Sequence, residues 1–147
     1  MDILVDTGVL LRLTIRSDPG HPEARQSIRL LKSRGENLIS LTQNAAEFWN
    51  VCTRPITARG GFNLSIQETT RRLHLVERLL EIRSDSKPIF EEWKRLVTQH
   101  SVRGVQVHDS RLVAAMNILR ITHILTFNKR DFERYREITV VSPADVK

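Results

Sequence analysis

The chain has 147 residues, of which 40% are hydrophobic and 27% are charged. This balance is typical of one folded globular domain and excludes a disordered or collagen-like chain, so we expect a single domain over residues 1–147. The only cysteine is Cys52, which excludes an intrachain disulfide and a cage of thiolates around a metal. The net charge of +6 favours a polyanionic partner.

The first residues of the chain contain neither a basic segment nor a long apolar run. A signal peptide needs both features, and a membrane-spanning helix needs about 20 apolar residues. We therefore expect a cytoplasmic protein that has no contact with membranes.

Two short apolar runs near the start of the chain predict buried strands. Ile3–Val5 is the first and ends at Asp6, and residues 37–41 are the second. A helix is predicted between them, because Pro22 stands at a favoured first-turn position and Gly35 at a favoured end position.

The next segments predict a helix, a loop and another helix. Residues 45–51 are an apolar helical stretch, and residues 54–64 form a basic loop with one proline and two adjacent glycines. Ser65 begins a capping-box pattern, which predicts a helix from there to about Leu80.

The last third of the chain predicts two helices followed by two strands. The helices start near Pro88 and at Asp109, and the strands cover residues 121–127 and 138–141. The strands are apolar on both faces and alternate with helices. The fold class is therefore α/β, with a central, mostly parallel sheet that helices flank on both sides.

Three aspartates are predicted to meet at one edge of this sheet. Asp6 follows the first strand, Asp109 begins a helix, and Asp131 comes shortly after the strand 121–127. In parallel α/β sheets, ligands bind outside the carboxyl ends of the strands, where these residues fall. Capping of helix amides is the structural alternative for each aspartate.

Glu47 favours the functional interpretation, because it lies inside the apolar helical stretch, beyond any capping position. A carboxylate there is costly unless a positive group holds it. Pairing with an arginine is one explanation. A divalent cation is the better one, since four carboxylates at one edge repel one another and Mg²⁺ or Mn²⁺ relieves that repulsion. Such an ion supports phosphodiester hydrolysis without a nucleophilic side chain.

Four segments carry a resemblance to a known family. They are the strand that ends in Asp6-Thr7, the helix with Glu47, and the runs His108–Ala115 and Leu125–Phe132. In this order and in a chain of this size, they resemble the PIN-domain ribonucleases, especially VapC-type toxins of bacterial toxin-antitoxin pairs.

The resemblance implies a three-layer fold and endonucleolytic cleavage of RNA. It also implies an Mg²⁺ or Mn²⁺ site formed by Asp6, Glu47, Asp109 and Asp131. The partners that it implies are an RNA substrate, a cognate antitoxin protein and a second copy of the chain in a homodimer.

The chain departs from the family pattern at two positions. Gly8 replaces the asparagine or serine that often follows Asp-Thr, which removes a side chain but no ligand. Asn128 stands where some members carry an acid, so either Asn128 is a neutral outer-shell group or the fourth carboxylate has shifted to Asp131. By position, Thr7 and Thr126 also belong to the outer shell, and ordinary strand-end threonines are the alternative.

A basic stretch predicts where RNA binds. Residues 48–67 contain no acid, and they include Arg54 and Arg59, with Arg71 and Arg72 soon after. We expect these four arginines to contact the RNA backbone. A solvated basic surface that promotes solubility is the alternative.

Other functions are weaker fits to the same residues. A housekeeping RNA-processing nuclease shares all of the chemistry, a phosphoryl-receiver domain lacks its usual acidic pair here, and an inactive RNA-binding relative does not need four carboxylates. No zinc-ligand spacing occurs among the histidines. Trp49 and Trp93 lie at helical spacing with apolar residues and are predicted to belong to the core, not to stack on bases.

Overall fold

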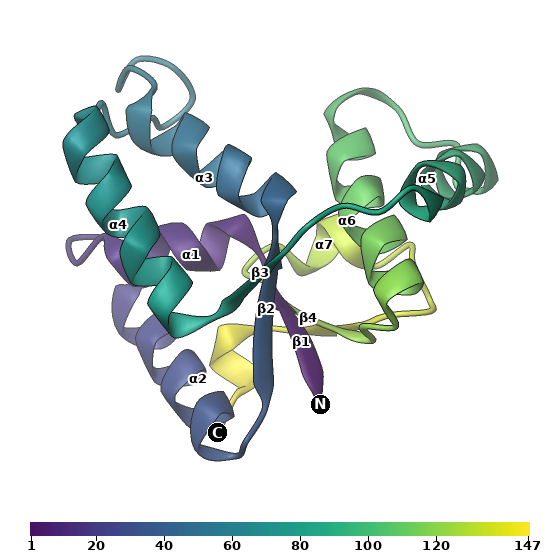
Figure 1. Cartoon of the computed structure of the whole chain (residues 1–147), viewed down its shortest axis with the longest axis horizontal. Coiled ribbons are helices and arrows are strands. Elements are labelled where there is room, and N and C mark those ends of the chain that lie inside the picture. The colour runs from purple at the N-terminus through teal and green to yellow at the C-terminus, as the bar shows by residue number, and fades with distance from the viewer.

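The computed structural model describes residues 1–147 and has a five-stranded parallel sheet at its centre (Figure 1). The strands are arranged in the order β3-β2-β1-β4-β5, and every neighbouring pair is parallel. Their bounds are Asp2–Val5 for β1, Asn37–Leu41 for β2, Glu81–Arg83 for β3, His123–Leu125 for β4 and Thr139–Val141 for β5.

Helices cover both faces of the sheet and complete three layers. One face packs against α1 (Thr7–Thr14), α2 (His21–Ser33), α3 (Thr42–Thr53) and α4 (Ile66–Leu79). The other packs against α5 (Pro88–Gln99), α6 (Val107–Leu119) and α7 (Lys129–Phe132). Two short 3-10 helices, η1 (Gly104–Gln106) and η2 (Pro143–Asp145), complete the chain. The predicted fold class is therefore confirmed.

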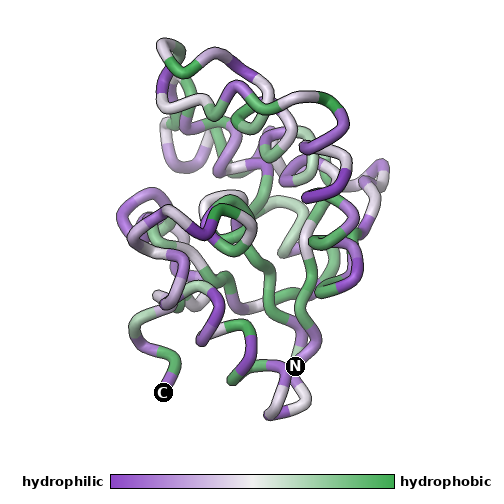
Figure 2. Tube along the Cα trace, turned by 90° about the vertical axis from the view of Figure 1, so that its left-hand side faces the viewer, coloured by the Kyte–Doolittle hydropathy of each residue, from purple (hydrophilic) through white to green (hydrophobic).

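The alternation of side chains along β1 creates two separate cores. Ile3 and Val5 point to the core with α1 to α4, whereas Leu4 points to the core with α5 and α6. Each face is hydrophobic because helices cover both, as parallel sheets require. Hydrophobic segments run through the centre of the molecule in Figure 2, and hydrophilic segments lie mostly at its outside. None of the helices has the combination of length and apolar character that crossing a membrane requires.

The strand order predicts a ligand site beside β1. From β1 the chain moves outward to β2 and β3, and then returns to the other side of β1 to form β4 and β5. The order reverses between β1 and β4, and ligands of open α/β sheets bind at the carboxyl ends of the strands at such a point. Asp6 lies there, and its backbone N–H donates to the carbonyl of Leu125 at 3.0 Å.

Several elements differ from the sequence prediction. The strand predicted over residues 121–127 is only His123–Leu125, because Thr126 turns to contact Asp6. Helix α6 begins at Val107, not at Asp109. Strand β3 was not predicted, since it has only three residues and two of them are charged.

Candidate active site

Asp6 is held by hydrogen bonds to both of its carboxylate oxygens. It follows β1 as the N-cap of α1, and only 8% of its surface is exposed. Its Oδ1 accepts from the backbone N–H of Thr7 at 2.8 Å, and its Oδ2 accepts from the hydroxyl of Thr126 at 2.7 Å. Asp6 therefore does cap a helix, as the structural alternative required, but the contact from Thr126 goes beyond capping and fixes the direction of the carboxylate.

Glu47 lies close to Asp6 because Thr7 contacts both residues. The Thr7 hydroxyl donates to Oε2 of Glu47 at 2.7 Å and accepts from the Asn44 amide at 3.1 Å. The other oxygen, Oε1, accepts from the Gln43 amide at 2.9 Å. No arginine pairs with Glu47, so the arginine-pairing alternative is wrong. Neutral donors orient this carboxylate and leave its negative charge uncompensated.

Asp109 and Asp131 complete the group from helices on the other face of the sheet. They are the third residues of α6 and α7. Burial and, in decreasing order of importance, the negative charges of Asp131, Asp6 and Glu47 together raise the pKa of Asp109 to about 7. The four predicted carboxylates therefore lie within electrostatic reach of one another.

The same interactions act on Asp6. Burial raises its pKa to about 6, and the charges of Glu47 and Asp131 act in the same direction. The hydrogen bonds from Thr126 and Thr7 oppose this change, because they stabilise the charged form. A cluster in which two carboxyls resist ionisation is short of positive charge.

A hydrated divalent cation fits this donor set. No three side chains of histidine, cysteine, aspartate or glutamate are arranged to hold a metal ion by themselves. Mg²⁺, however, usually keeps several waters and uses one or two carboxylates. Asp6 and Glu47 have hard oxygen donors in fixed directions, and the raised pKa values mark a place where a cation relieves repulsion.

The two threonines that were predicted as outer-shell groups contact carboxylates of the cluster. Thr7 and Thr126 each donate a hydroxyl hydrogen to a carboxylate oxygen of the cluster. Asn128 takes part through its backbone, since its N–H donates to the Thr126 hydroxyl at 3.0 Å, whereas the residue itself is exposed. Asn128 is a neutral residue. Asp131 carries the fourth acidic group, and its charge raises the pKa of Asp6 and of Asp109.

Sequence reasoning missed the residues that support Glu47. Gln43 donates to Glu47 and also to the carbonyl of His108 at 2.8 Å, which ties α3 to α6. The guanidinium of Arg111 donates to Oε1 of Gln43 at 2.7 Å and to Asp85 at 2.7 Å. The only signal in the sequence is that Gln43 lies four residues before Glu47, one helical turn away.

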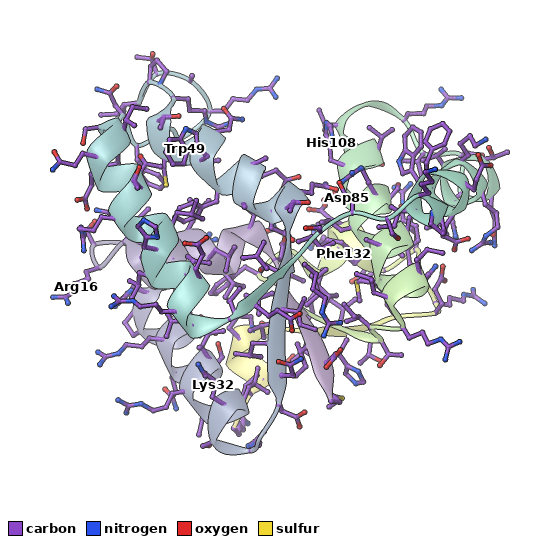
Figure 3. The ribbon with its side chains drawn as sticks, viewed as in Figure 1. Arg16, Lys32, Trp49, Asp85, His108 and Phe132 are labelled. Atoms are coloured by element: carbon purple, nitrogen blue, oxygen red, sulfur yellow. The ribbon has the colours of Figure 1, made fainter.

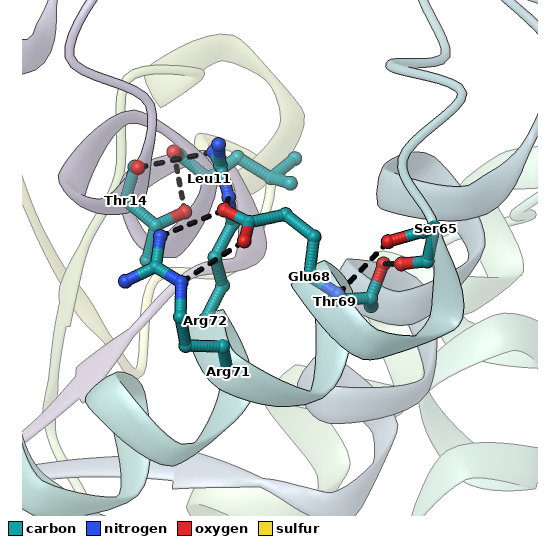
Figure 4. A network of polar contacts seen from close by, with 7 residues as sticks. All are labelled: Leu11, Thr14, Ser65, Glu68, Thr69, Arg71 and Arg72. Carbon is teal, nitrogen blue, oxygen red and sulfur yellow. Dashed lines mark hydrogen bonds and ion pairs between the residues drawn. The ribbon is translucent and has the colours of Figure 1, made fainter.

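The predicted RNA-binding arginines fall in two places. Arg54 and Arg59 lie in the loop after α3, where the Arg54 guanidinium donates to the Arg59 carbonyl. Arg71 and Arg72 lie on α4 and share the carboxylate of Glu68, as Figure 4 shows. Arg72 also donates to the carbonyl at the end of α1.

Arg71 and Arg72 line a groove of about 700 Å³ between α1, α2 and α4. The charged side chains of this groove are all basic, and no acid lines it; besides these two arginines they are Arg16, Arg25, Arg29 and Lys32. Figure 3 labels Arg16 and Lys32 on one flank of the molecule, and Asp85 and His108 on the other side of β2. The groove is therefore separate from the contacts around Glu47.

The raised pKa values predict how the metal-free protein responds to pH. Asp109 titrates near its ordinary value of 3.8 when unfolded and at about 7 when folded, so unfolding becomes easier as pH rises through this window. Asp109→Asn removes this loss of stability, because the asparagine side chain does not ionise. We expect it to raise the free energy of unfolding at pH ~8 by about 1 kcal/mol, after allowance for partial exposure, and to have little effect near pH ~4.

Urea denaturation in a chelator at both pH values checks this expectation. Asp145→Asn is the matched control, because Lys129 lowers the pKa of Asp145 and its neutralisation brings no gain at high pH. An Asp109→Asn protein that is less stable than the wild type at pH ~8 contradicts the proposed repulsion.

Comparisons with known proteins agree with this geometry. The protein-family model described as PIN domain matches residues 3–138. A chain of the VapBC2 complex from Rickettsia felis, described as bound to a promoter DNA fragment, has a TM-score of 0.71 at 14% identity, over 97% of this chain and 98% of that chain. A search of curated proteins gave no match.

Two other solved structures have the same fold. VapC20 from Mycobacterium tuberculosis, described as a toxin that cleaves the sarcin-ricin loop, has a TM-score of 0.60 at 17% identity, over 83% of this chain and 86% of that one. A toxin-antitoxin complex from Klebsiella pneumoniae has a TM-score of 0.64 at 20% identity, over 96% and 97%. At these identities the likeness concerns the fold.

Proposed function

This chain belongs to the PIN domain family, and we propose that it is a metal-dependent endoribonuclease that acts as the toxin of a toxin-antitoxin pair. The observation that carries the proposal is the group of four carboxylates at the switch point of the sheet, with Asp6 and Glu47 oriented by Thr126 and Thr7. The VapC20 structure, described as a toxin that cleaves the sarcin-ricin loop, supports it.

Asp6, Glu47, Asp109 and Asp131 would hold Mg²⁺ or Mn²⁺ together with its waters. When bound, the ion polarises a phosphoryl oxygen and lowers the pKa of a bound water. The chain contributes orientation: Thr7 and Thr126 keep the Asp6 and Glu47 oxygens in place before any ion arrives, which avoids reorganisation during the reaction.

Mapping of RNA ends tests the activity directly. Brief expression of the wild-type protein in cells should create new cleavage ends at defined bonds in total RNA, and expression of Asp6→Asn should not. Identical end profiles for the two proteins, both present at the same level, would remove the ribonuclease proposal.

An antitoxin is the proposed protein partner, and the proposed assembly includes a homodimer of this chain. Structures with the same fold are described as complexes of VapB and VapC or of toxin and antitoxin. An arginine of the antitoxin fits the carboxylate cluster, because a guanidinium forms two hydrogen bonds to a carboxylate. Apolar contacts along α1 or α3 would supply further affinity.

The arginines of the loop after α3 are proposed to bind the RNA backbone. Loss of a phosphate contact lowers the slope of log affinity against log salt by about 0.7 for single strands. The double variant Arg54→Ala, Arg59→Ala should therefore lower the slope by about 1.4 and weaken binding of all sequences alike. Arg120→Ala, Arg136→Ala, which removes two exposed arginines elsewhere, is the control. Equal salt slopes in the two double variants would place the RNA path away from this loop.

A further inference from the structure

A second cavity lies next to the support of Glu47. Its volume is about 470 Å³, and it is formed by the segment after β3, the first turns of α5 and one residue of α6. Seven residues line it: Asp85, Ser86, Lys87, Ile89, Phe90, Trp93 and Arg111. Two of them are aromatic and two are cationic, so the cavity combines flat apolar surface with positive charge.

The aromatic residues form a partly open pair. Phe90 is 58% exposed, and the ammonium of Lys94 lies 4.8 Å from its ring centroid. Its ring centroid lies 6.1 Å from that of Trp93, with 25° between the ring planes. The indole N–H of Trp93 donates to the carbonyl of Val107 at 2.9 Å, which fixes the ring.

The sequence prediction for Trp93 needs a correction. We predicted a core residue, and one side of Trp93 does pack against the core between α5 and α6. The residue is nevertheless only partly buried, and its ring also lines the cavity. Helical spacing shows which side of a helix faces the core, but it does not show that an indole is wide enough to reach the surface as well.

Hydrogen bonds join this cavity to the carboxylate cluster. Arg111 lines the cavity and donates to Gln43 at 2.7 Å, and Gln43 donates to Glu47 at 2.9 Å. Only two side chains therefore separate the cavity from a carboxylate of the site. An RNA strand with its scissile phosphate at Glu47 would have to extend only past Gln43 and Arg111 to reach the cavity.

The chemistry of the cavity suits an unstacked nucleobase. Single-stranded nucleic acid is bound by aromatic rings on which bases stack and by cations that contact the backbone. Phe90 and Trp93 offer the rings, and Lys87 offers a cation, whereas the charge of Arg111 is paired with Asp85 at 2.7 Å. The carboxylate of Asp85 and the hydroxyl of Ser86 add polar groups for the edge of a base.

We propose that this cavity is a base-binding subsite, which holds one base of the RNA strand within two nucleotides of the bond that is cut. The proposal rests on the proposed ribonuclease function and adds a determinant of substrate choice. A second copy of the chain is a poorer occupant. A stable interface buries about 800 Å² on each partner, and the surface of α5 beside Phe90 carries the charged pair of Glu91 and Lys94.

The experiment measures RNA binding without cleavage. The probe is a short, fluorescein-labelled single-stranded RNA centred on a bond that the wild-type protein cuts, kept intact by a chelator. A set of probes carries one abasic nucleotide at each position in turn. Fluorescence anisotropy gives the affinity of each probe for the wild type, for Phe90→Ala and for Ile66→Ala, a control whose side chain is 62% exposed on α4.

Stacking of one base predicts a defined pattern of affinities. Phe90→Ala should weaken binding of the intact probe about 10-fold, and Ile66→Ala should not. The affinity of the wild type should fall by a similar factor when the abasic nucleotide stands at one position. The affinity of Phe90→Ala should not depend on whether that position carries a base. In a Trp49→Phe background, which leaves Trp93 as the only tryptophan, the intact probe should quench the fluorescence more than the abasic one.

Two results would overturn the subsite and leave the ribonuclease proposal intact. One is equal affinity of the wild type and Phe90→Ala for a probe that both proteins cut. The other is a Phe90→Ala protein that changes only its oligomeric state, which would assign this surface to a second copy of the chain. A wild-type protein that cuts no RNA would instead contradict the proposed function itself.

Discussion

Replacement of Asp6 by asparagine should abolish RNA cleavage, with a loss of at least about 10³-fold in rate, and leave the protein folded. The asparagine oxygen still accepts from the Thr7 N–H that Asp6 binds at 2.8 Å, so the cap of α1 survives. The negative charge is lost at the most buried carboxylate of the cluster, and with it the attraction for the cation.

Cleavage of a fluorescent RNA by the purified protein measures this effect. A chelator should stop the wild-type reaction, and Mg²⁺ or Mn²⁺ should restore it. Asp145→Asn, which changes an exposed aspartate that pairs with Lys129, should cleave like the wild type. Circular dichroism shows whether the variants fold. A folded Asp6→Asn protein with full activity would show that Asp6 is only a helix cap.

The fold was accessible from the sequence because burial on both sides leaves a simple pattern. Ile3–Val5 and the buried part of residues 37–41 are apolar except for Ser40, whose hydroxyl donates to the Val5 carbonyl. Pro22 and Pro88 lie in the first turns of two helices, as predicted. Strand β3 lacks such a pattern. It lies at the edge of the sheet, where its Glu81 and Arg83 side chains reach solvent and pair with each other, so its residues look like those of a loop.

The acids of the site were predictable one by one, but their support was not. Asp6 and Glu47 stand out because a carboxylate next to a strand or inside an apolar helix is unusual. Gln43 and Arg111 are ordinary polar residues on helix surfaces, and 68 residues of sequence separate them. Only the fold brings them together, because α3 and α6 cover opposite faces of the sheet and their first turns meet through Gln43, His108 and Arg111. A sequence pattern within either helix therefore contains no sign of the contact.

The hydrogen bonds around Glu47 do not include a positively charged donor. Glu47 receives its hydrogen bonds from the neutral groups of Thr7 and Gln43, and the nearby Arg111 pairs with Asp85 instead. The chain therefore orients Glu47 without an ion pair. We propose that a cation from outside the chain completes the site, either a metal ion or an arginine of another protein.

Metal and antitoxin should therefore compete for the same carboxylates. We expect the protein to copurify with the product of the short reading frame beside its gene when both are expressed, and we expect the complex to cleave no RNA. Addition of Mg²⁺ should weaken the affinity of the antitoxin by about 10-fold, because the ion must leave before an arginine can bind Asp6, Glu47 and Asp109.

Titration calorimetry in a chelator and in Mg²⁺ measures the two affinities. The double variant Asp6→Asn, Asp109→Asn is the control, since its antitoxin affinity should no longer depend on Mg²⁺. An antitoxin that inhibits equally well with and without the ion in the wild type would place its inhibitory contact outside the cluster. A genuine neighbouring frame whose product neither binds nor inhibits would end the toxin interpretation, and the same carboxylates would then belong to a housekeeping RNA-processing nuclease.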